Sequence, residues 1–363
     1  MPRACSPPSA PPPISASELS TAAELLYTKA GQWLQGRNRQ RILALNAAPE
    51  PALRGLAEAT DLTVQQAFRP DWLQLQRMGF APVATLEEAA PGSEPSFDLA
   101  LVLPGKQREQ SLGMLATGML ALRPEGMMMA ACANDMGGKS YEKRLVEMTG
   151  NVDSTSKSHC RLFSVKRNGR FRTAMAEVWE REAAPRMVAS HGLIARPGNF
   201  SWERPDIGSE LLRRYLENWP PAGAGMDLCC GYGYLAHRIL AACPGISELY
   251  LVDADRHALD CAIANTRDTR VAVHAHWLDA SNESLPANLD WIVLNPPFHR
   301  GKIRDIALGQ AIAAKACQSL RPGGRLAMVA NRQLPYERTC RELLTICDIA
   351  EQSEGFKILD GIR

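Results

Sequence analysis

The sequence lacks the features that mark several other classes of protein. Its 363 residues contain no run of about 18 apolar residues, which excludes a membrane-spanning helix. For the same reason we expect no membrane partner. Its ten cysteines form no C-x-x-C pair, so we expect reduced thiols, no metal site and a cytoplasmic protein. An excess of charge of one sign is missing too. The net charge is only +2, so any nucleic-acid binding must come from a local patch.

The order of apolar and breaking residues indicates a tail and two domains. Six of the first 13 residues are proline, and no apolar core of a secretory signal is present, so we expect 1–18 to be a disordered tail. Beyond it, strand-like apolar runs alternate with helical stretches, which is typical of an α/β fold with a mainly parallel sheet. Glycine and proline cluster in 190–209, and we therefore predict domains over 19–185 and 186–363.

Two blocks of the sequence recur in the second half of the chain, 192 and 198 residues further on; they are 97–104 against 289–296, and 122–126 against 320–324. Any two α/β domains share a strand–helix–glycine–strand order, but the repeat favours two copies of one Rossmann-like fold. The first copy has Leu103 where the second has Asn295, and no glycine loop follows its opening strand at 41–45. We therefore expect the first domain to be catalytically degenerate.

A turn with two glycines, Gly231 and Gly233, follows a predicted strand that contains Asp227. Glycines there let a ligand approach the backbone, although a purely structural turn between strand and helix uses them equally. The dinucleotide fingerprint G-x-G-x-x-G would need a third glycine where this chain has Ala236. A carboxylate at Asp227 suits a cationic ligand such as the sulfonium and amine of S-adenosylmethionine, so the pattern favours the methyl donor.

Two further carboxylates follow predicted strands. Asp253 ends the strand at 249–252, where it could accept hydrogen bonds from a ribose diol or cap the next helix. Asp279 follows the strand at 271–277, where it could accept from the adenine amine or serve as a turn residue. Both would lie at the carboxyl edge of the sheet, where ligands bind in open α/β folds.

The apolar run 291–294 ends in Asn295-Pro296-Pro297-Phe298. The prolines make the turn rigid, so the Asn295 side-chain oxygen and the Pro296 carbonyl are presented as fixed acceptors, and Phe298 offers a flat apolar face. Accepting both protons of an amino group would aim its lone pair at an electrophilic methyl group. A planar substrate with an exocyclic amine fits; the alternative is a proline-rich turn with a buried phenylalanine.

Together these motifs resemble class I S-adenosylmethionine-dependent methyltransferases of the N-P-P-[FY] type. They are more similar to ribosomal RNA guanine-N2 methyltransferases built from two tandem domains, the first degenerate. The similarity covers the second domain nearly end to end and is weaker in the first; it also uses the segments 197–201, 206–209, 295–301, 329–336 and 355–358. It implies methyl transfer to the exocyclic N2 amine of a guanine in ribosomal RNA, most specifically the 16S RNA of the small subunit, by a protein that we expect to be a monomer.

The resemblance also assigns residues to roles. Asp227, Gly231 and Gly233 would bind the methionine end of the cofactor, together with Cys229, which stands where the family usually has glycine. Asp253 would bind its ribose and Asp279 its adenine. The guanine would be held by Asn295, Pro296 and Phe298. The cofactor site would be closed by Phe200 and Asp206.

Basic residues gather in 157–172, which holds six of them, two phenylalanines and no acidic residue. Lys157, Arg161, Arg167 and Arg170 are therefore candidates for RNA contact, and the net charge of +3 in 1–190 supports them. The alternative is a solvated hairpin turning at 168–169. Two more candidates, His299 and Arg300, follow the catalytic loop; an exposed helix start would explain them nearly as well.

Three other functions fit part of the sequence. The first is guanine-N2 methylation of 23S RNA by an enzyme of the same architecture. The second is methylation of a protein glutamine or a DNA adenine, against which the degenerate tandem domain argues. The third is a catalytically weak RNA-binding protein of ribosome assembly, with Cys229 as the residue that suggests it.

Overall fold

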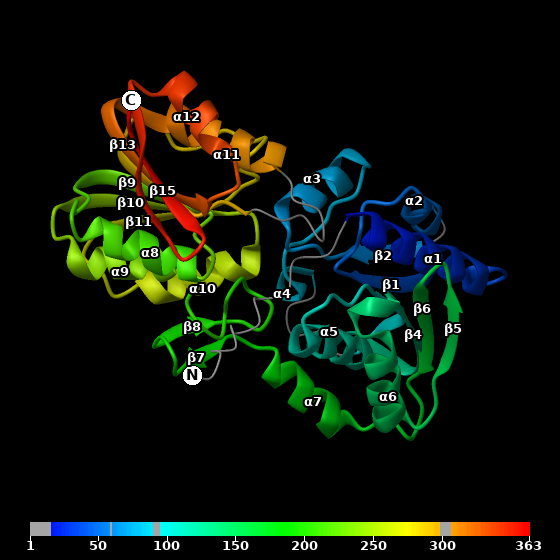
Figure 1. The fold of residues 1–363 in the computed structure, drawn as a ribbon. Coiled ribbons are helices and arrows are strands. Elements are labelled where there is room, and N and C mark those ends of the chain that lie inside the picture. The colour runs from blue at the N-terminus through cyan, green and yellow to red at the C-terminus, as the bar shows by residue number, and fades with distance from the viewer. Residues whose placement is uncertain (1–15, 59, 90–94, 298–305) are drawn as a thin grey trace, which may run out of the picture.

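The computed structural model describes residues 16–58, 60–89, 95–297 and 306–363. Figure 1 shows two α/β lobes side by side. The first contains α1 (Ala16–Leu34), β1 (Gln40–Leu45), α2 (Ala52–Ala57), β2 (Thr60–Val64), α3 (Arg69–Arg77), α4 (Leu86–Ala89), β3 (Phe97–Val102), α5 (Arg108–Ala121), β4 (Leu122–Ala133), the 3-10 turn η1 (Asn134–Met136), α6 (Gly138–Thr149), β5 (Asp153–Lys157), β6 (Cys160–Lys166) and α7 (Thr173–Glu182). Helix α1 includes 16–18, the last three residues of the predicted tail.

A short hairpin and the second lobe follow: β7 (Arg186–Val188), β8 (Leu193–Ala195), α8 (Ile207–Leu216), β9 (Gly223–Leu228), α9 (Tyr234–Ala242), β10 (Ile246–Asp253), α10 (Arg256–Thr266), β11 (Ala272–Trp277), β12 (Leu289–Leu294), α11 (Ile306–Ser319), β13 (Leu320–Asn331), α12 (Tyr336–Leu343), β14 (Ile346–Ser353) and β15 (Phe356–Ile362). None of the described helices has both the length and the apolar character that crossing a membrane requires.

The two sheets share one strand order except at the edge that β11 forms in the second. The second has the order β11-β10-β9-β12-β13-β15-β14, with the first five strands parallel and the last two antiparallel. The first has the order β2-β1-β3-β4-β6-β5, again parallel until its final hairpin. This confirms the predicted pair of tandem α/β domains. Between β2 and β3, the described residues reduce the counterpart of β11 to an isolated parallel bridge between Gln65 and Val83, so this edge of the first sheet is shortened.

The recurring sequence blocks occupy equivalent strands. β4 and β13 each have 12 residues and the same order of buried and exposed positions until their last residue. Asp98 pairs with Arg123 in the first domain, and Asp290 pairs with Arg321 in the second. Each aspartate also accepts a hydrogen bond from a backbone N–H at the start of the first strand of its own sheet. The two domains are therefore structural repeats down to individual side-chain contacts.

The central strand β12 positions the predicted catalytic loop. Trp291 and Val293 pack into the core on one face of the sheet, while Ile292 and Leu294 pack into the core on the other. A strand buried on both faces is typical of the middle of a parallel sheet. Asn295 therefore leaves the sheet at its carboxyl edge, next to the loop that follows β9.

The basic hairpin differs from the predicted one. β5 and β6 are joined by Ser158 and His159, whose φ angles are 50° and 58°. Positive φ at both positions defines the tight type I′ turn that matches the twist of a hairpin. The predicted turn at 168–169 is wrong, because that segment lies beyond the end of β6.

Candidate active site

Asn295 is oriented by two residues near the start of α8. Its Nδ2 donates to the Asp206 carboxylate, at 2.9 Å, and to the Ser209 hydroxyl, at 2.8 Å. Asp206 is in turn held in place because it caps α8, accepting from the Ser209 N–H at 2.9 Å. Both amide protons of Asn295 are thus engaged, which leaves its side-chain oxygen to accept a hydrogen bond from a ligand.

The rest of the predicted guanine-binding loop is only partly visible. Pro296 is buried, and its carbonyl remains a predicted acceptor. Phe298 lies outside the described residues, as do the RNA-contact candidates His299 and Arg300.

Asp227 is a buried carboxylate with one unsatisfied oxygen. Its side chain is in β9, and the residue is 1% exposed. One oxygen accepts from the Ala236 N–H at 2.9 Å, whereas Oδ1 has no hydrogen-bond partner among the described residues. Burial, reinforced by the charge of Asp253, raises the pKa of Asp227 to about 7. A cationic group bound beside Oδ1 would satisfy it and favour the ionised form.

The two loop glycines have different tasks. Gly231 has a φ of 54°, and a Cβ there would meet no atom within 4 Å, so the loop leaves open space at this residue. Its N–H donates to Asp253 at 2.7 Å, which ties the loop to the end of β10. Gly233 has a φ of 82°, and a Cβ there would lie 2.9 Å from Ala262 in α10. Gly233 is needed for packing, and Gly231 is the one beside the open space.

The other two predicted carboxylates lie at the ends of β10 and β11. Asp253 does not cap α10, because Asp255 does so by accepting from the His257 N–H; the alternative that Asp253 is the helix cap is therefore wrong. Asp279 is buried and accepts hydrogen bonds from Ser281 and Asn282 in the following turn. Its turn role is thus present in the structure, and its adenine role stays a prediction.

Cys229 bends the loop between Asp227 and Gly231. Its φ of 60° is in the left-handed region that glycine adopts without strain. Burial also raises the pKa of the Cys229 thiol well above its usual range, so the thiol is protonated at neutral pH. The loop therefore tolerates a side chain where the family usually has glycine.

These groups meet around one cavity. It is lined by Phe200, Ser201, Asp206, Ser209, Asp227, Cys229, Cys230, Gly231, Tyr232, Tyr234, Leu235 and Asn295. Six of the predicted site residues are among them; Gly233, Asp253, Asp279 and Pro296 are outside the lining. Sequence reasoning missed Ser209, Tyr232 and Tyr234. Ser209 belongs to the segment 206–209 that carries the resemblance, and the tyrosines alternate with the loop glycines, so position in a motif was the available signal.

The groups that line the cavity suit the methionine end of the methyl donor that the motifs imply. The unsatisfied oxygen of Asp227 can take a cationic amine, and the open space at Gly231 admits a ligand close to the backbone. No group of three His, Cys, Asp or Glu side chains within the described ranges is arranged to hold a metal ion.

The RNA-contact candidates of the first domain have unequal surroundings. Lys157 and Arg170 are exposed. Arg161 pairs with Glu142, and the Arg167 guanidinium donates to the backbone carbonyls of Leu120 and Leu122 at the end of α5. Arg363 makes the equivalent contacts at the end of α11 in the second domain, which gives Arg167 a structural task. The RNA role of all four residues stays a prediction.

Comparison with known proteins identifies the family. A family model described as methyltransferase small domain matches residues 190–360. A ribosomal RNA small subunit methyltransferase C from Pseudomonas aeruginosa is 32% identical over 273 residues, which cover 72% of this chain and 78% of that protein. The chain belongs to the ribosomal RNA small subunit methyltransferase C family. The family resemblance predicted from the motifs is thereby confirmed.

Other members of the family extend the similarity. One from Pseudomonas entomophila is 29% identical over 276 residues, covering 74% of this chain and 80% of its own. The structure of a T. thermophilus 16S rRNA N2 methyltransferase, solved with AdoMet and guanosine, superposes with a TM-score of 0.77 at 21% identity. It covers 98% of this chain and 94% of that one, so the two share both domains of the fold. Family membership favours small-subunit RNA over the 23S, protein and DNA alternatives.

Proposed function

We propose that this protein transfers the methyl group of S-adenosylmethionine to the exocyclic N2 amine of a guanine in 16S ribosomal RNA. The orientation of Asn295 carries this proposal. Asp206 and Ser209 hold both of its amide protons, so the oxygen that remains is an acceptor suited to an amine and unsuited to a carbonyl. The T. thermophilus structure adds support, because that protein was solved in complex with AdoMet and guanosine.

In the proposed reaction, the chain orients the guanine amine and provides fixed hydrogen-bond acceptors for its protons. The bound donor supplies an electrophilic methyl group. Asn295 Oδ1 and the Pro296 carbonyl accept the two amine protons, which turns the nitrogen lone pair away from the ring and towards the methyl carbon. As the N–C bond forms and the S–C bond to the methyl group breaks, with S-adenosylhomocysteine as the leaving group, the same acceptors would stabilise the positive charge on nitrogen. One proton then leaves to water, so no strong base is required.

Cofactor binding is assigned to the loops after β9, β10 and β11. Asp227 would hold the cationic amine, Gly231 would let the methionine end approach the backbone, and Asp253 and Asp279 would bind the adenosine. Phe200 and Asp206 line the cavity from the segment before α8 and would close it.

We assign catalysis to 186–363 and support and RNA contact to 19–185. The exposed Lys157 and Arg170, with His299 and Arg300 near the catalytic loop, are the candidates for the RNA backbone. We further propose that the protein acts as a monomer in the cytoplasm. Its proposed substrate is RNA within the small ribosomal subunit, and the names of its relatives support small-subunit RNA.

The test is a transfer assay with labelled S-adenosylmethionine and unmodified 30S or 50S subunits, followed by digestion of the RNA to nucleosides. We expect label in N2-methylguanosine from 30S subunits and none with Asn295→Ala. Label confined to 50S subunits would move the proposal to 23S RNA. Transfer to neither, with no cofactor binding, would leave the binding-only alternative.

A further inference from the structure

The two domains meet through the same segment of each. Residues 67–69 follow β2 and begin α3, and residues 254–256 follow β10 and begin α10. The Arg69 N–H donates to the Ala254 carbonyl at 2.8 Å, and the Arg256 N–H donates to the Ala67 carbonyl at 3.0 Å. Phe68 and Asp255 form the antiparallel bridge between them. We call this exchange between structural repeats the reciprocal clasp.

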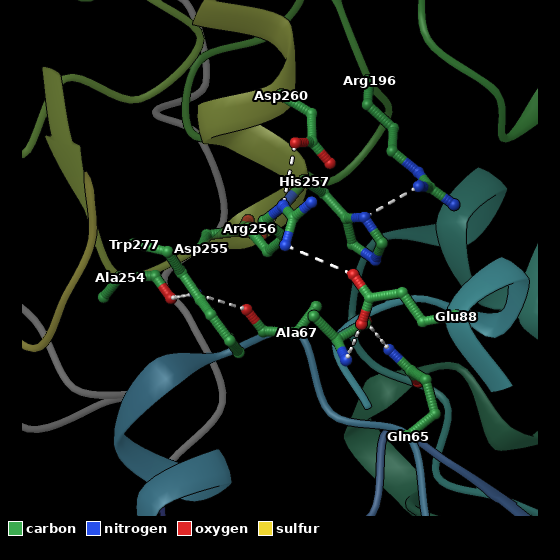
Figure 2. Close-up of polar contacts among 11 residues, drawn as sticks. Gln65, Ala67, Glu88, Arg196, Ala254, Asp255, Arg256, His257, Asp260 and Trp277 are labelled. Carbon is green, nitrogen blue, oxygen red and sulfur yellow. Dashed lines mark hydrogen bonds and ion pairs between the residues drawn. The ribbon is translucent and has the colours of Figure 1, made fainter. Parts of the chain in front are cut away.

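Two ion pairs between the domains follow the same reciprocal pattern. Arg69 pairs with Glu283 of the second domain at 2.7 Å, and Arg256 pairs with Glu88 of the first at 3.3 Å (Figure 2 shows the latter pair). Each glutamate also accepts a backbone N–H four residues before it; Glu283 accepts from Asp279 at 2.8 Å, and Glu88 from Ala84 at 2.9 Å. Each arginine therefore holds a glutamate that shapes a loop of the other domain.

The two halves of the clasp differ in what that loop carries. The loop held by Arg69 contains Asp279, whereas its counterpart held by Arg256 contains Ala84 and no carboxylate at that position. Arg69 is also the better enclosed arginine, with 18% of its side chain exposed against 33% for Arg256. Its guanidinium lies over two indole rings, 4.6 Å from the centre of Trp72 and 5.0 Å from that of Trp277.

Trp277 joins the clasp to the edge where the cofactor carboxylates lie. Its Nε1 donates to the carbonyls of both Ala67 and Ala254, as Figure 2 shows. The next residue, Leu278, donates its N–H to the Asp253 carbonyl at 3.1 Å. The strand ends that carry Asp253 and Asp279 are thus connected to each other and, through Trp277 and Glu283, to the first domain.

We propose that Arg69 is a positioning residue for the adenosine of the cofactor, acting from the first domain through Glu283 on Asp279. The inference rests on the proposed function, which places the adenosine between Asp253 and Asp279. Arg69 offers a planar fork that binds both Glu283 oxygens, at 2.9 and 2.7 Å, and its charge offsets that of the glutamate. Without it, Glu283 turns towards solvent and the Asp279 loop loses its fixed place.

The test compares Arg69→Met and Arg69→Lys with Glu88→Gln in the full chain. Glu88→Gln breaks the counterpart ion pair but keeps an oxygen for the Ala84 N–H, so it is the matched control. We would measure the Kd of S-adenosylhomocysteine by calorimetry, the Tm, and hydrogen exchange of 277–283 by mass spectrometry. We expect the Kd to rise about tenfold in Arg69→Met and about threefold in Arg69→Lys, with faster exchange of 277–283. The control should keep the affinity of the unaltered protein.

The outcomes separate the inference from the function on which it rests. An unaltered protein that binds no S-adenosylhomocysteine refutes the proposed function. An unaltered protein that binds, with both Arg69 variants binding equally well, refutes the positioning role alone. Equal loss of affinity in Glu88→Gln would show that the clasp acts only by holding the domains together, and would also overturn the role of Arg69. If Arg69→Met does not fold, Arg69→Lys decides: unchanged affinity overturns the proposal.

Discussion

The first and second domains have similar backbones but different side chains at the positions equivalent to the candidate site. Strand register and loop hydrogen bonds put their residues in correspondence: the second domain has Asp227, Cys229, Asp253 and Asn295 where the first has Ala44, Asn46, Gln66 and Leu103. Asn46 and Cys229 even share a left-handed φ, 52° and 60°. The backbone geometry of the loop therefore does not by itself produce a cofactor site.

In the first domain, the corresponding polar side chains form hydrogen bonds with neighbouring backbone groups. The Asn46 amide donates to the Leu103 carbonyl at 2.8 Å, and the Gln66 amide donates to the Ala47 carbonyl at 2.9 Å. The Ala48 N–H donates to the Tyr27 hydroxyl at 3.0 Å. The second domain instead retains a buried carboxylate with an unsatisfied oxygen at Asp227. A functional pocket keeps unsatisfied groups for its ligand, and a scaffold is free to pair them.

The largest effect should follow from giving the second domain the acceptor-free residue of the first. Asn295→Leu removes a preorganised acceptor from the reacting amine, and we expect kcat to fall about 10³-fold. Because the proposed function places Asn295 against the substrate amine and away from the cofactor, cofactor affinity should stay within a few-fold. Single-turnover methyl transfer and cofactor titration measure the two effects; transfer at the unaltered rate would disprove the assignment of Asn295.

Neutralising Asp227 should lower cofactor affinity while raising the stability of the cofactor-free protein. Asp227→Asn keeps an oxygen for the Ala236 N–H but loses the charge that we propose attracts the cofactor amine, so we expect cofactor affinity to fall about 100-fold. In the unaltered protein, affinity should decline as the pH falls below about 7, because Asp227 then takes up a proton that binding must expel. Calorimetric titrations above and below neutral pH measure both. An affinity independent of pH would contradict the raised pKa.

The same substitution should stabilise the cofactor-free protein. The unfolded chain ionises Asp227 near the ordinary value of 3.8 and the folded chain only at about 7, so ionisation opposes folding. Relative to Asp227→Asn, the unaltered protein should lose about 1.4 kcal/mol per pH unit between these values and no more above them. Thermal unfolding of both proteins across this range gives the comparison.

The two loop glycines should respond differently to alanine. Gly233→Ala places a Cβ against Ala262 at a positive φ, and we expect it to cost about 2–3 kcal/mol of stability. Gly231→Ala meets open space in the protein alone, so it should cost about 1 kcal/mol but impair cofactor binding more strongly. Denaturant unfolding and cofactor titration of both variants test the distinction; a Gly231→Ala variant with unaltered cofactor affinity would place the ligand elsewhere.

The smallest effect concerns the corresponding left-handed residues of the two domains. Cys229→Gly removes backbone strain, and we expect a change in stability within about 0.5 kcal/mol and unaltered or tighter cofactor binding. Asn46→Gly relieves similar strain but loses the bond to Leu103, so we expect a cost of about 1 kcal/mol. Equal effects would mean that Asn46 contributes nothing through its hydrogen bond to Leu103.

Local patterns predicted the parts of the site that one strand and its loop determine. The apolar run before Asn295 and the glycines after β9 place both loops at one sheet edge by the rules of parallel sheets. Residues that act across long separations were beyond such patterns. The Arg69–Glu283 pair joins residues 214 positions apart, and no periodicity marks either of them.

Charge alone did not indicate the structural role of Arg167. Arg167 belongs to the most basic stretch of the chain, yet its guanidinium binds backbone carbonyls, because a helix end nearby leaves them without partners. The turn of the basic hairpin was predicted at the wrong position because strand pairing, rather than the local turn signal, determines it. Asn-Gly at 168–169 is the stronger turn signal, but the strand pairing with β4 sets where β6 begins and ends, and Ser158 and His159 adopt the turn.

The reciprocal clasp has the symmetry of an interface between two identical subunits, since each side offers the same segment to the other. Here both sides belong to one chain, so their association is intramolecular and independent of protein concentration. Only one of two linked domains needs a functional ligand pocket, because the other can contribute through the interface alone. One chain thus has the internal symmetry of a dimer, with a candidate active site in its second domain.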